Sequence, residues 1–117
     1  MRVEVFDDEN GKVTLDIMFT RTPLGGRRYF GKKELIDTTC FIFRAGRQLA
    51  YATARQNPLD NYNKIIGRKV ALAKAIAKTK ILKLSPHSYQ TLTGKHRRKV
   101  NCSRIWKVFH QTFGRWN

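Results

Sequence analysis

The chain alternates between apolar and polar residues in its first half and changes to a helical pattern in its second half. Residues 2–19 show a period of two around Asn10-Gly11, which predicts a β-hairpin. A three-residue loop over residues 9–11 pairs Val5 with Leu15 and gathers the apolar side chains on one face. A two-residue loop would place a glutamate opposite an isoleucine, so we favour the longer loop.

Residues 37–55 predict a second hairpin, with a three-residue loop over residues 44–46 that pairs Phe41 with Leu49. One face of this hairpin carries small side chains that would let a helix approach closely: Cys40, Ile42, Ala50 and Ala52. Exposed strand aromatics can stack bases. Phe41 and Phe43 have either this role or the more common role of core residues.

The segment between the hairpins, residues 21–33, is rich in glycine and in cations. Glycine gives such a segment conformational freedom or allows a partner to approach closely. The segment is therefore either a flexible connection or a basic finger that presents Arg27 and Arg28.

The second half of the chain predicts three helices. Asn57 can cap the first, which begins at Pro58, runs to about Leu82 and can bend at Gly67. The second follows Ser85, and a basic loop separates it from the third. The second helix would end at Gly94, and the basic loop covers residues 95–99. The third helix would be capped by Asn101 or Ser103 and would end at Gly114. The third helix has an aromatic-rich apolar face: Ile105, Trp106, Phe109 and Phe113.

At 100° per residue, the first helix separates into two faces. The predicted core face is apolar: Tyr62, Ile66, Val70, Ala73 and Ala77. The predicted outer face carries cations with two alanines among them: Lys64, Arg68, Lys74 and Lys78, with Ala71 and Ala75. Lys69 points toward the apolar arc of a straight helix. A bend at Gly67 would instead let Arg68 and Lys69 begin an anion site at a helix start.

These elements predict an α+β fold in a single domain, residues 1–117. Two antiparallel β-hairpins in residues 1–56 would form a sheet. A long basic amphipathic helix and two shorter C-terminal helices in residues 57–117 would cover it.

Charge separates the two halves more sharply than hydrophobicity does. The chain has 24 Lys and Arg against 8 Asp and Glu, a net charge of +16. All eight acids lie in the first 60 residues, whereas residues 61–117 hold fourteen cations and no acid. Such a basic surface is an electrostatic footprint for a polyanion. The predicted partner is therefore RNA, DNA or a nucleoprotein complex.

The predicted contacts are phosphate contacts made by the long helix, the basic loop and the glycine-rich segment. The candidate residues are Lys64, Arg68, Lys69, Lys74, Lys78, Lys95, Arg97, Arg98, Lys99, Arg27 and Arg28. No cofactor, metal, membrane or small-molecule partner is expected.

Catalysis is not expected either. Two cysteines give neither a disulfide framework nor a four-ligand zinc site, and they fit a reduced, cytoplasmic compartment. The N-terminus has no apolar leader, and no apolar run approaches the length of a membrane span. A nuclease that uses Asp16, Glu34 and Asp37 is a minor alternative.

Two resemblances add to this interpretation. Residues 40–54 and 67–82 resemble the second half of a double-stranded-RNA-binding domain, in which a hairpin leads to a helix that opens with basic residues. Only Arg68 and Lys69 match the basic triplet of that family, Leu72 stands where a third cation belongs, and the preceding helix is missing. The family's preference for RNA is therefore not transferred.

The second resemblance covers more of the chain. The pattern C-F-x-F-R-A-G from Cys40, followed by D-x-Y-N-K-x-x-G-R-K-x-A-L-x-K-A from Asp60, is similar to small basic proteins encoded by bacteriophages. It implies host takeover or counter-defence, including anti-CRISPR action, in the host cell cytoplasm.

The sequence thus predicts a non-enzymatic protein that binds the phosphate backbone of a nucleic acid. One alternative is an inhibitor that docks on an acidic or RNA-containing surface of a nucleoprotein complex. Another is a structural component of a ribonucleoprotein particle.

Overall fold

The computed structural model describes residues 1–7, 11–22, 27–79 and 91–114, of which residues 6, 7, 11 and 91–100 are described by their backbone alone. The elements follow in the order β1 (Arg2–Asp7), β2 (Gly11–Arg21), β3 (Arg28–Phe30), β4 (Lys33–Leu35), β5 (Thr38–Arg44), β6 (Arg47–Ala54), α1 (Lys64–Lys78) and α2 (Thr91–Phe113).

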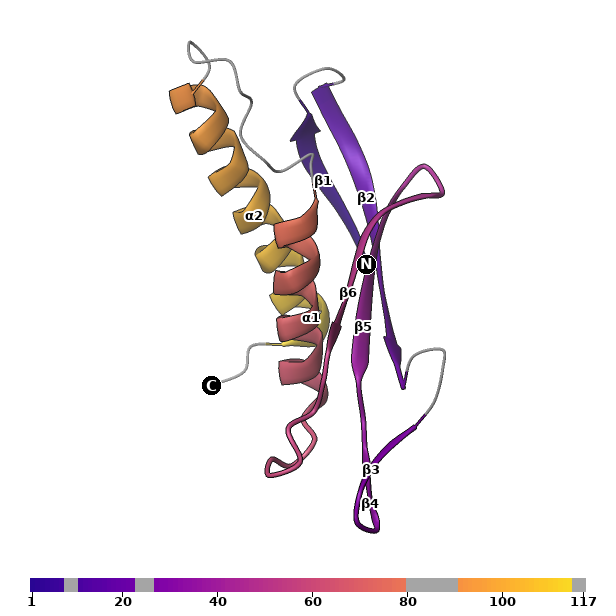
Figure 1. The fold of residues 1–117 in the computed structure, drawn as a ribbon. Helices are drawn as coiled ribbons and strands as arrows, with labels where there is room; N and C mark the ends of the chain where they lie inside the picture. The colour runs from indigo at the N-terminus through magenta and orange to yellow at the C-terminus, as the bar shows by residue number, and fades with distance from the viewer. Residues whose placement is uncertain (8–10, 23–26, 80–90, 115–117) are drawn as a thin grey trace.

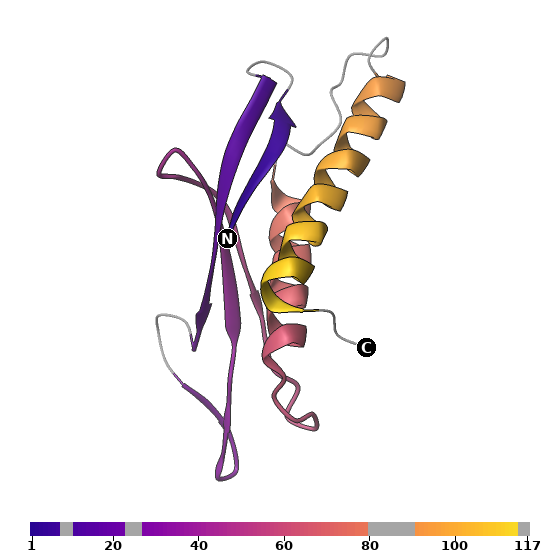
Figure 2. The ribbon, with the colours of Figure 1, turned by 180° about the vertical axis from the view of Figure 1, so that it is seen from behind.

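The main sheet is antiparallel and has the strand order β1-β2-β5-β6. Both helices lie on one side of it, α1 across β5 and β6 and α2 against β1 (Figures 1 and 2). The opposite face of the sheet is covered by none of the described helices and strands. The α+β class predicted from the sequence, with helices on one face of two paired hairpins, is confirmed.

The core fills the space between the inner face of the sheet and the two helices. Inward-pointing residues of the four strands alternate with outward-pointing ones, as a strand requires. The largest fully buried apolar side chains are Phe109, Leu15, Ile17, Ile42, Leu72, Ile105 and Val5.

The first hairpin has the predicted faces but a different register. Val5 pairs with Val13 and Val3 with Leu15, so the strands are shifted by two residues from the expected pairing. A shift of two keeps every side chain on the same face because the strand period is two. Burial of these side chains therefore agrees with the prediction although the register does not.

The second hairpin turns through two residues instead of the predicted three. Ala45 and Gly46 have φ values of 49° and 78°, which is the backbone of a type I′ turn. A β-bulge after Ile42 then takes up one residue and brings Phe41 opposite Tyr51. The small residues Cys40, Ile42, Ala50 and Ala52 are buried under the helix, as expected.

The glycine-rich segment contains a short hairpin and is not simply a loop. β3 and β4 pair as a separate two-stranded sheet around Gly31, whose φ is 63°. This hairpin projects beyond one end of the main sheet (Figure 1). Arg28 of the predicted finger thus lies on a strand, whereas residues 23–26 of the segment lie outside the described residues.

Helix α1 begins six residues later than predicted. The Asn63 side chain accepts hydrogen bonds from the backbone N–H groups of Ile65 and Ile66 and is the N-cap. The Asn57 side chain instead accepts from the Leu59 N–H group and closes a local turn. Both asparagines start a local structure, but only the second is followed by residues that can pack on the sheet.

The face of α1 that packs on the sheet is opposite to the predicted one. The buried residues are Ala71, Leu72, Ala75 and Ile76. Ile66 and Val70 are 36% and 40% exposed, and Ala73 and Ala77 face solvent. The prediction favoured the larger aliphatic side chains, whereas the structure uses small alanines that bring the helix close to the sheet.

Gly67 is the closest point of that approach. A Cβ atom added there would lie 2.6 Å from Thr38 Oγ1 and 3.3 Å from Thr38 Cβ. The glycine lies within the continuous helix Lys64–Lys78, so the predicted bend is not needed to explain it. Its role is to allow contact with β5.

Gly67→Ala is therefore expected to destabilise the protein by about 1–3 kcal/mol through overpacking. Helix propensity alone predicts the opposite sign, a gain of about 1 kcal/mol. Urea unfolding of Gly67→Ala, Thr38→Ala and the double variant measures the steric term, because Thr38→Ala removes the hydroxyl that clashes. An alanine at position 67 that stabilises the parent protein would contradict the close contact.

Helix α2 replaces two predicted helices and the basic loop between them. It runs without interruption through Gly94, residues 95–99, Asn101 and Ser103, so neither predicted cap begins a helix. The predicted start at Ser85 lies outside the described residues. The predicted stop is confirmed, because Gly114 has a φ of 85° and its N–H group donates to the His110 carbonyl.

The second half of α2 is held by an aromatic cluster. Phe109 is fully buried, and its ring lies 6.1 Å from that of Phe19, 5.5 Å from that of Trp106 and 5.1 Å from that of Phe113, measured between centroids. Ile105 is also fully buried. The predicted apolar face of the last helix is thereby confirmed.

Candidate nucleic-acid interface

Two lysines of α1 reach across to the outer strand of the sheet. Lys74 Nζ donates to the Thr53 carbonyl at 3.4 Å, and Lys78 Nζ donates to the Tyr51 carbonyl at 3.2 Å. Four residues of helix rise about 6.0 Å and two residues of strand about 6.8 Å, so the lysines match alternate carbonyls of β6. They supply donors and positive charge to a sheet edge that would otherwise be open to strand pairing.

The other candidate cations of α1 have different surroundings. Lys64 and Lys69 are exposed. The guanidinium of Arg68 lies 4.5 Å from the centroid of the Phe113 ring and is partly buried between the helices. This cation–π contact gives Arg68 a structural role in joining α1 to α2.

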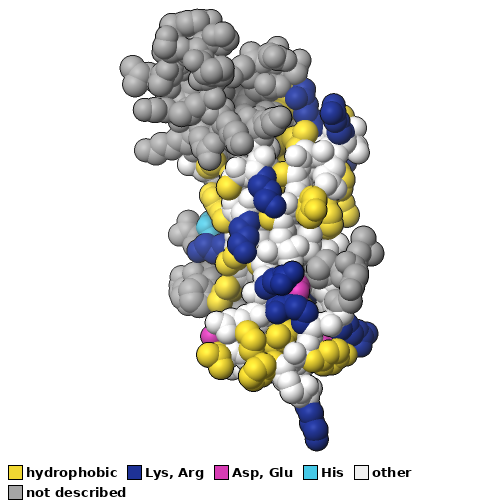
Figure 3. Space-filling model, viewed as in Figure 1, with side chains coloured by type: hydrophobic (Ala, Val, Ile, Leu, Met, Phe, Trp, Pro, Cys, Tyr) yellow, Lys and Arg dark blue, Asp and Glu magenta, His cyan; other side chains and the backbone are white. Residues whose placement is uncertain are grey.

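The acids of the first half neutralise arginines of that same half. Ion pairs of this kind in the described part of the chain include Arg2–Asp16, Arg27–Glu34 and Arg28–Asp37. None of them involves a cation of α1. Figure 3, seen from the side of α1 and β6, shows Lys and Arg side chains spaced along the molecule with few acids between them.

Arg28 and Arg27 differ in how strongly they are engaged. Arg28 Nε donates to Asp37 Oδ2 at 2.9 Å. Arg28 Nη2 donates both to Asp37 Oδ1 and to the Gln56 carbonyl, the latter at 3.1 Å. This network anchors the β3–β4 hairpin to the main sheet. Arg27 forms a looser, exposed pair with Glu34 at 3.5 Å. Arg28 is therefore the less available of the two for a phosphate.

The hydrogen bonds from Arg28 hold the pKa of the Asp37 carboxyl below its usual value. A depressed pKa in the folded state means that the pair stabilises the protein above the unfolded value of about 3.9 and that this contribution is lost as the pH falls through the folded pKa. Asp37→Asn should therefore lower the urea midpoint more at pH 7 than in acid near pH 2. Glu34→Gln is the matched control, because its pair is exposed. An Asp37→Asn effect of equal size at both pH values would contradict the assignment.

Residues 95–99 lie on the first half of α2, so the predicted basic loop is wrong. Lysine and arginine are good helix formers, and a single glycine within a helix costs only about 1 kcal/mol. Lys95, Arg97, Arg98 and Lys99 thus follow a helical backbone. Their side chains lie outside the described part of the structure.

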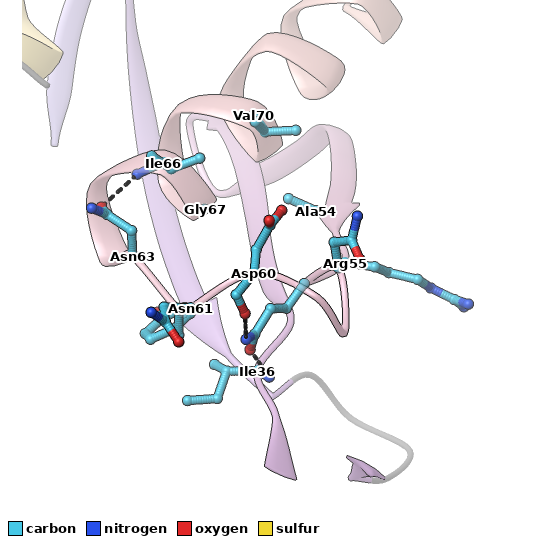
Figure 4. Close-up of a pocket in the computed structure, with 12 residues that line it drawn as sticks. Ile36, Ala54, Arg55, Asp60, Asn61, Asn63, Ile66, Gly67 and Val70 are labelled. Atoms are coloured by element: carbon cyan, nitrogen blue, oxygen red, sulfur yellow. Dashed lines mark hydrogen bonds between the residues drawn. The ribbon is translucent and has the colours of Figure 1, made fainter. Parts of the chain in front are cut away.

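The predicted anion site at Arg68 and Lys69 is not formed. Asn63 satisfies the N–H groups of Ile65 and Ile66, and the Gly67 N–H group donates to the Asn63 carbonyl at 3.0 Å, as in an ordinary first turn. A hollow of about 520 Å³ adjoins this helix start. Figure 4 shows the Asp60 side chain directed into this hollow, and its negative charge disfavours a phosphate there.

The outer face of the sheet carries an aromatic row, which we define as Phe41, Phe43 and Tyr51. Phe41 and Phe43 alternate with the fully buried Cys40 and Ile42, so they point away from the helices. Tyr51 is 54% exposed. Of the two roles left open by the sequence, the core role is wrong for both phenylalanines. Tyr51 was missed, although the small residues on either side of it mark its strand face as the outer one.

Other chemistry has little support in the described part of the chain. Burial raises the pKa of the Cys40 thiol to about 12, which keeps it protonated and unreactive at neutral pH. No three His, Cys, Asp or Glu residues come together there as metal ligands.

None of the helices described is both long enough and apolar enough to span a bilayer. Comparisons with protein-family models, with curated proteins and with solved structures found no match for this chain.

Proposed function

We propose that this protein binds nucleic acid without catalysing a reaction on it, and that the exposed lysines of α1 contact the phosphate backbone. The observation that carries the proposal is the uncompensated charge of α1. Its cations have no carboxylate partner among the described residues, and residues 61–117 contain no acid at all. A bound polyanion would relieve the resulting repulsion.

The positions of the lysines also favour an extended polyanion over a single small anion. Lys64, Lys69, Lys74 and Lys78 follow the length of the helix, whose fifteen residues span about 22 Å. A nucleic acid strand carries one phosphate per nucleotide, so several phosphates fall within the length of the helix. Contacts to these phosphates are independent of sequence. Counter-defence or host takeover is the proposed setting, and it rests on the resemblance to phage proteins alone.

The test is fluorescence anisotropy with labelled single-stranded RNA, single-stranded DNA and duplex DNA at low salt. We expect dissociation constants below micromolar for at least one of the three. Micromolar or weaker binding to all three would overturn the proposal. A polyglutamate of similar length is the control for non-specific attraction to negative charge.

A second candidate function is inhibition of a nucleoprotein complex by docking on it. The specific observation is the apolar stripe that Ile66 and Val70 leave exposed between lysines of α1. Capture from cell extract before and after nuclease treatment separates the two functions. A protein partner that survives nuclease favours docking, whereas loss of every partner favours direct binding to nucleic acid.

A further inference from the structure

We infer that the open face of the main sheet stacks unpaired bases on the aromatic row, so that the ligand is a single-stranded nucleic acid. This inference rests on the proposed function and specifies its ligand. Duplex bases are stacked on one another and present only their edges in the grooves. Aromatic side chains on a sheet therefore contact the faces of bases only when a strand is unpaired.

The three rings lie next to one another and are nearly parallel. The centroid of Phe41 lies 6.2 Å from that of Phe43 and 6.1 Å from that of Tyr51, with interplanar angles of 23° and 26°. Met18, opposite Phe41 on β2, is 54% exposed and extends the apolar surface. Met18 and Tyr51 are exposed, and Phe41 and Phe43 are partly exposed. None of the four belongs to the core, which lies on the other side of the sheet.

Cations stand at the edge of this surface. Lys78 Nζ lies 5.6 Å from the centroid of the Tyr51 ring while it donates to the Tyr51 carbonyl. Lys74 holds the same relation to the carbonyl of Thr53, one turn earlier on α1. The phosphate of a base stacked on Tyr51 would thus lie near the amines of Lys78 and Lys74. Each ammonium group has three N–H donors, so both can still donate to a phosphate.

A shallow groove of about 680 Å³ runs from the aromatic row toward Arg55. It is lined by Thr20, by Thr53 and by the buried Thr39, whose hydroxyl lies 2.9 Å from that of Thr53 in a hydrogen bond. Asp37 also lines it, and its carboxylate is paired with Arg28. Each hydroxyl can both donate and accept. The exposed Thr20 and the partly exposed Thr53 therefore offer polar contacts to base edges or sugars beside the aromatic row.

A second copy of this chain is the other conceivable occupant of an exposed aromatic face. Two chains of charge +16 would repel one another, and the lysines at the edge of β6 would meet like charge. A nucleic acid is negatively charged, so the same cations would attract it. Charge complementarity therefore selects the nucleic acid.

The experiment compares a labelled oligouridylate with a labelled RNA duplex of equal length, using Tyr51→Leu, Tyr51→Phe and Phe41→Leu. Leucine keeps an apolar side chain but removes the π-face, whereas phenylalanine keeps the ring. We expect each leucine variant to bind the oligouridylate about tenfold more weakly and to bind the duplex unchanged. Tyr51→Phe should bind both as the parent does. Leu59→Ala, which removes an apolar side chain that is 85% exposed, is the control.

Equal binding of the oligouridylate by Tyr51→Leu and Tyr51→Phe would overturn the inference and leave the proposed function intact. A dimer in sedimentation that Tyr51→Leu dissociates would also overturn it, since a second copy would then occupy the face. If the parent protein binds neither probe, the proposed function itself fails. Urea midpoints of all variants within the error of the parent confirm that the fold is retained.

Discussion

A variant with four lysines of α1 replaced by glutamine is expected to bind single-stranded nucleic acid on the order of 10³-fold more weakly at 0.1 M salt. The association constant varies as the salt concentration raised to a negative power, and each phosphate contact to a single strand contributes about 0.7 to that power. Four contacts therefore change the affinity by roughly 10 to the power 2.8 at 0.1 M salt. The replaced residues are Lys64, Lys69, Lys74 and Lys78. Glutamine is uncharged, polar and a good helix former, and all four positions are exposed, so the fold should be retained.

The matched control removes four cations from elsewhere on the surface. We choose exposed residues of the first half outside the proposed interface: Lys12, Arg21, Lys32 and Arg47. This variant has the same net charge as the α1 variant but should lose less than about tenfold in affinity, because only screened, long-range attraction is reduced. Equal losses in the two variants would mean that total charge, and not the surface of α1, determines binding.

The second large effect is on stability. Phe109→Ala should reduce the free energy of unfolding by about 3–5 kcal/mol, since it removes a fully buried ring from the contacts with Phe19, Trp106 and Phe113. A domain of this size has a total of about 5–15 kcal/mol, so the variant should be close to unfolding. Urea unfolding followed by circular dichroism measures the change.

Phe30→Ala is the control for this experiment, because that ring is 57% exposed on the β3–β4 hairpin. Its expected effect is within about 0.5 kcal/mol. A loss of less than about 1 kcal/mol for Phe109→Ala would show that α2 does not depend on the aromatic cluster for its attachment to the sheet.

The strands could be predicted from the sequence because their period of two fixes the face of each side chain. Cys40 and Ile42 were correctly assigned to the helix side, and a shift of two residues in the first hairpin left its faces unchanged. Register could not be predicted, because it depends on the turn. The type I′ turn at Ala45-Gly46 places an alanine at positive φ, which its residue type does not favour.

The helix faces were harder to predict, since alanine is compatible with both a core and a surface. In α1, Ala71 and Ala75 are buried while Ile66 and Val70 are exposed. Hydrophobicity alone assigns the larger residues to the core. The deciding fact is the small inner face of β5 and β6, which accepts a helix only at close range. That is a tertiary constraint that a helical wheel does not contain.

The candidate site, too, could be predicted from the sequence only in part. The cations of α1 were identified from the absence of acids, and this feature needs no coordinates. The positions of Lys74 and Lys78 at the β6 edge, and the outward direction of the aromatic row, could be found only from the sheet. Arg28 illustrates the limit of a count of charges, because its partner Asp37 is nine residues away in sequence and becomes its neighbour only in the fold.

The most direct test of the central claim is the salt dependence of binding to single-stranded RNA. The logarithm of the association constant should fall linearly with the logarithm of the salt concentration for the parent protein. The slope for the variant lacking Lys64, Lys69, Lys74 and Lys78 should be smaller in magnitude by about 2.8, since four phosphate contacts are lost. An unchanged slope would contradict the claim that the lysines of α1 contact the phosphate backbone.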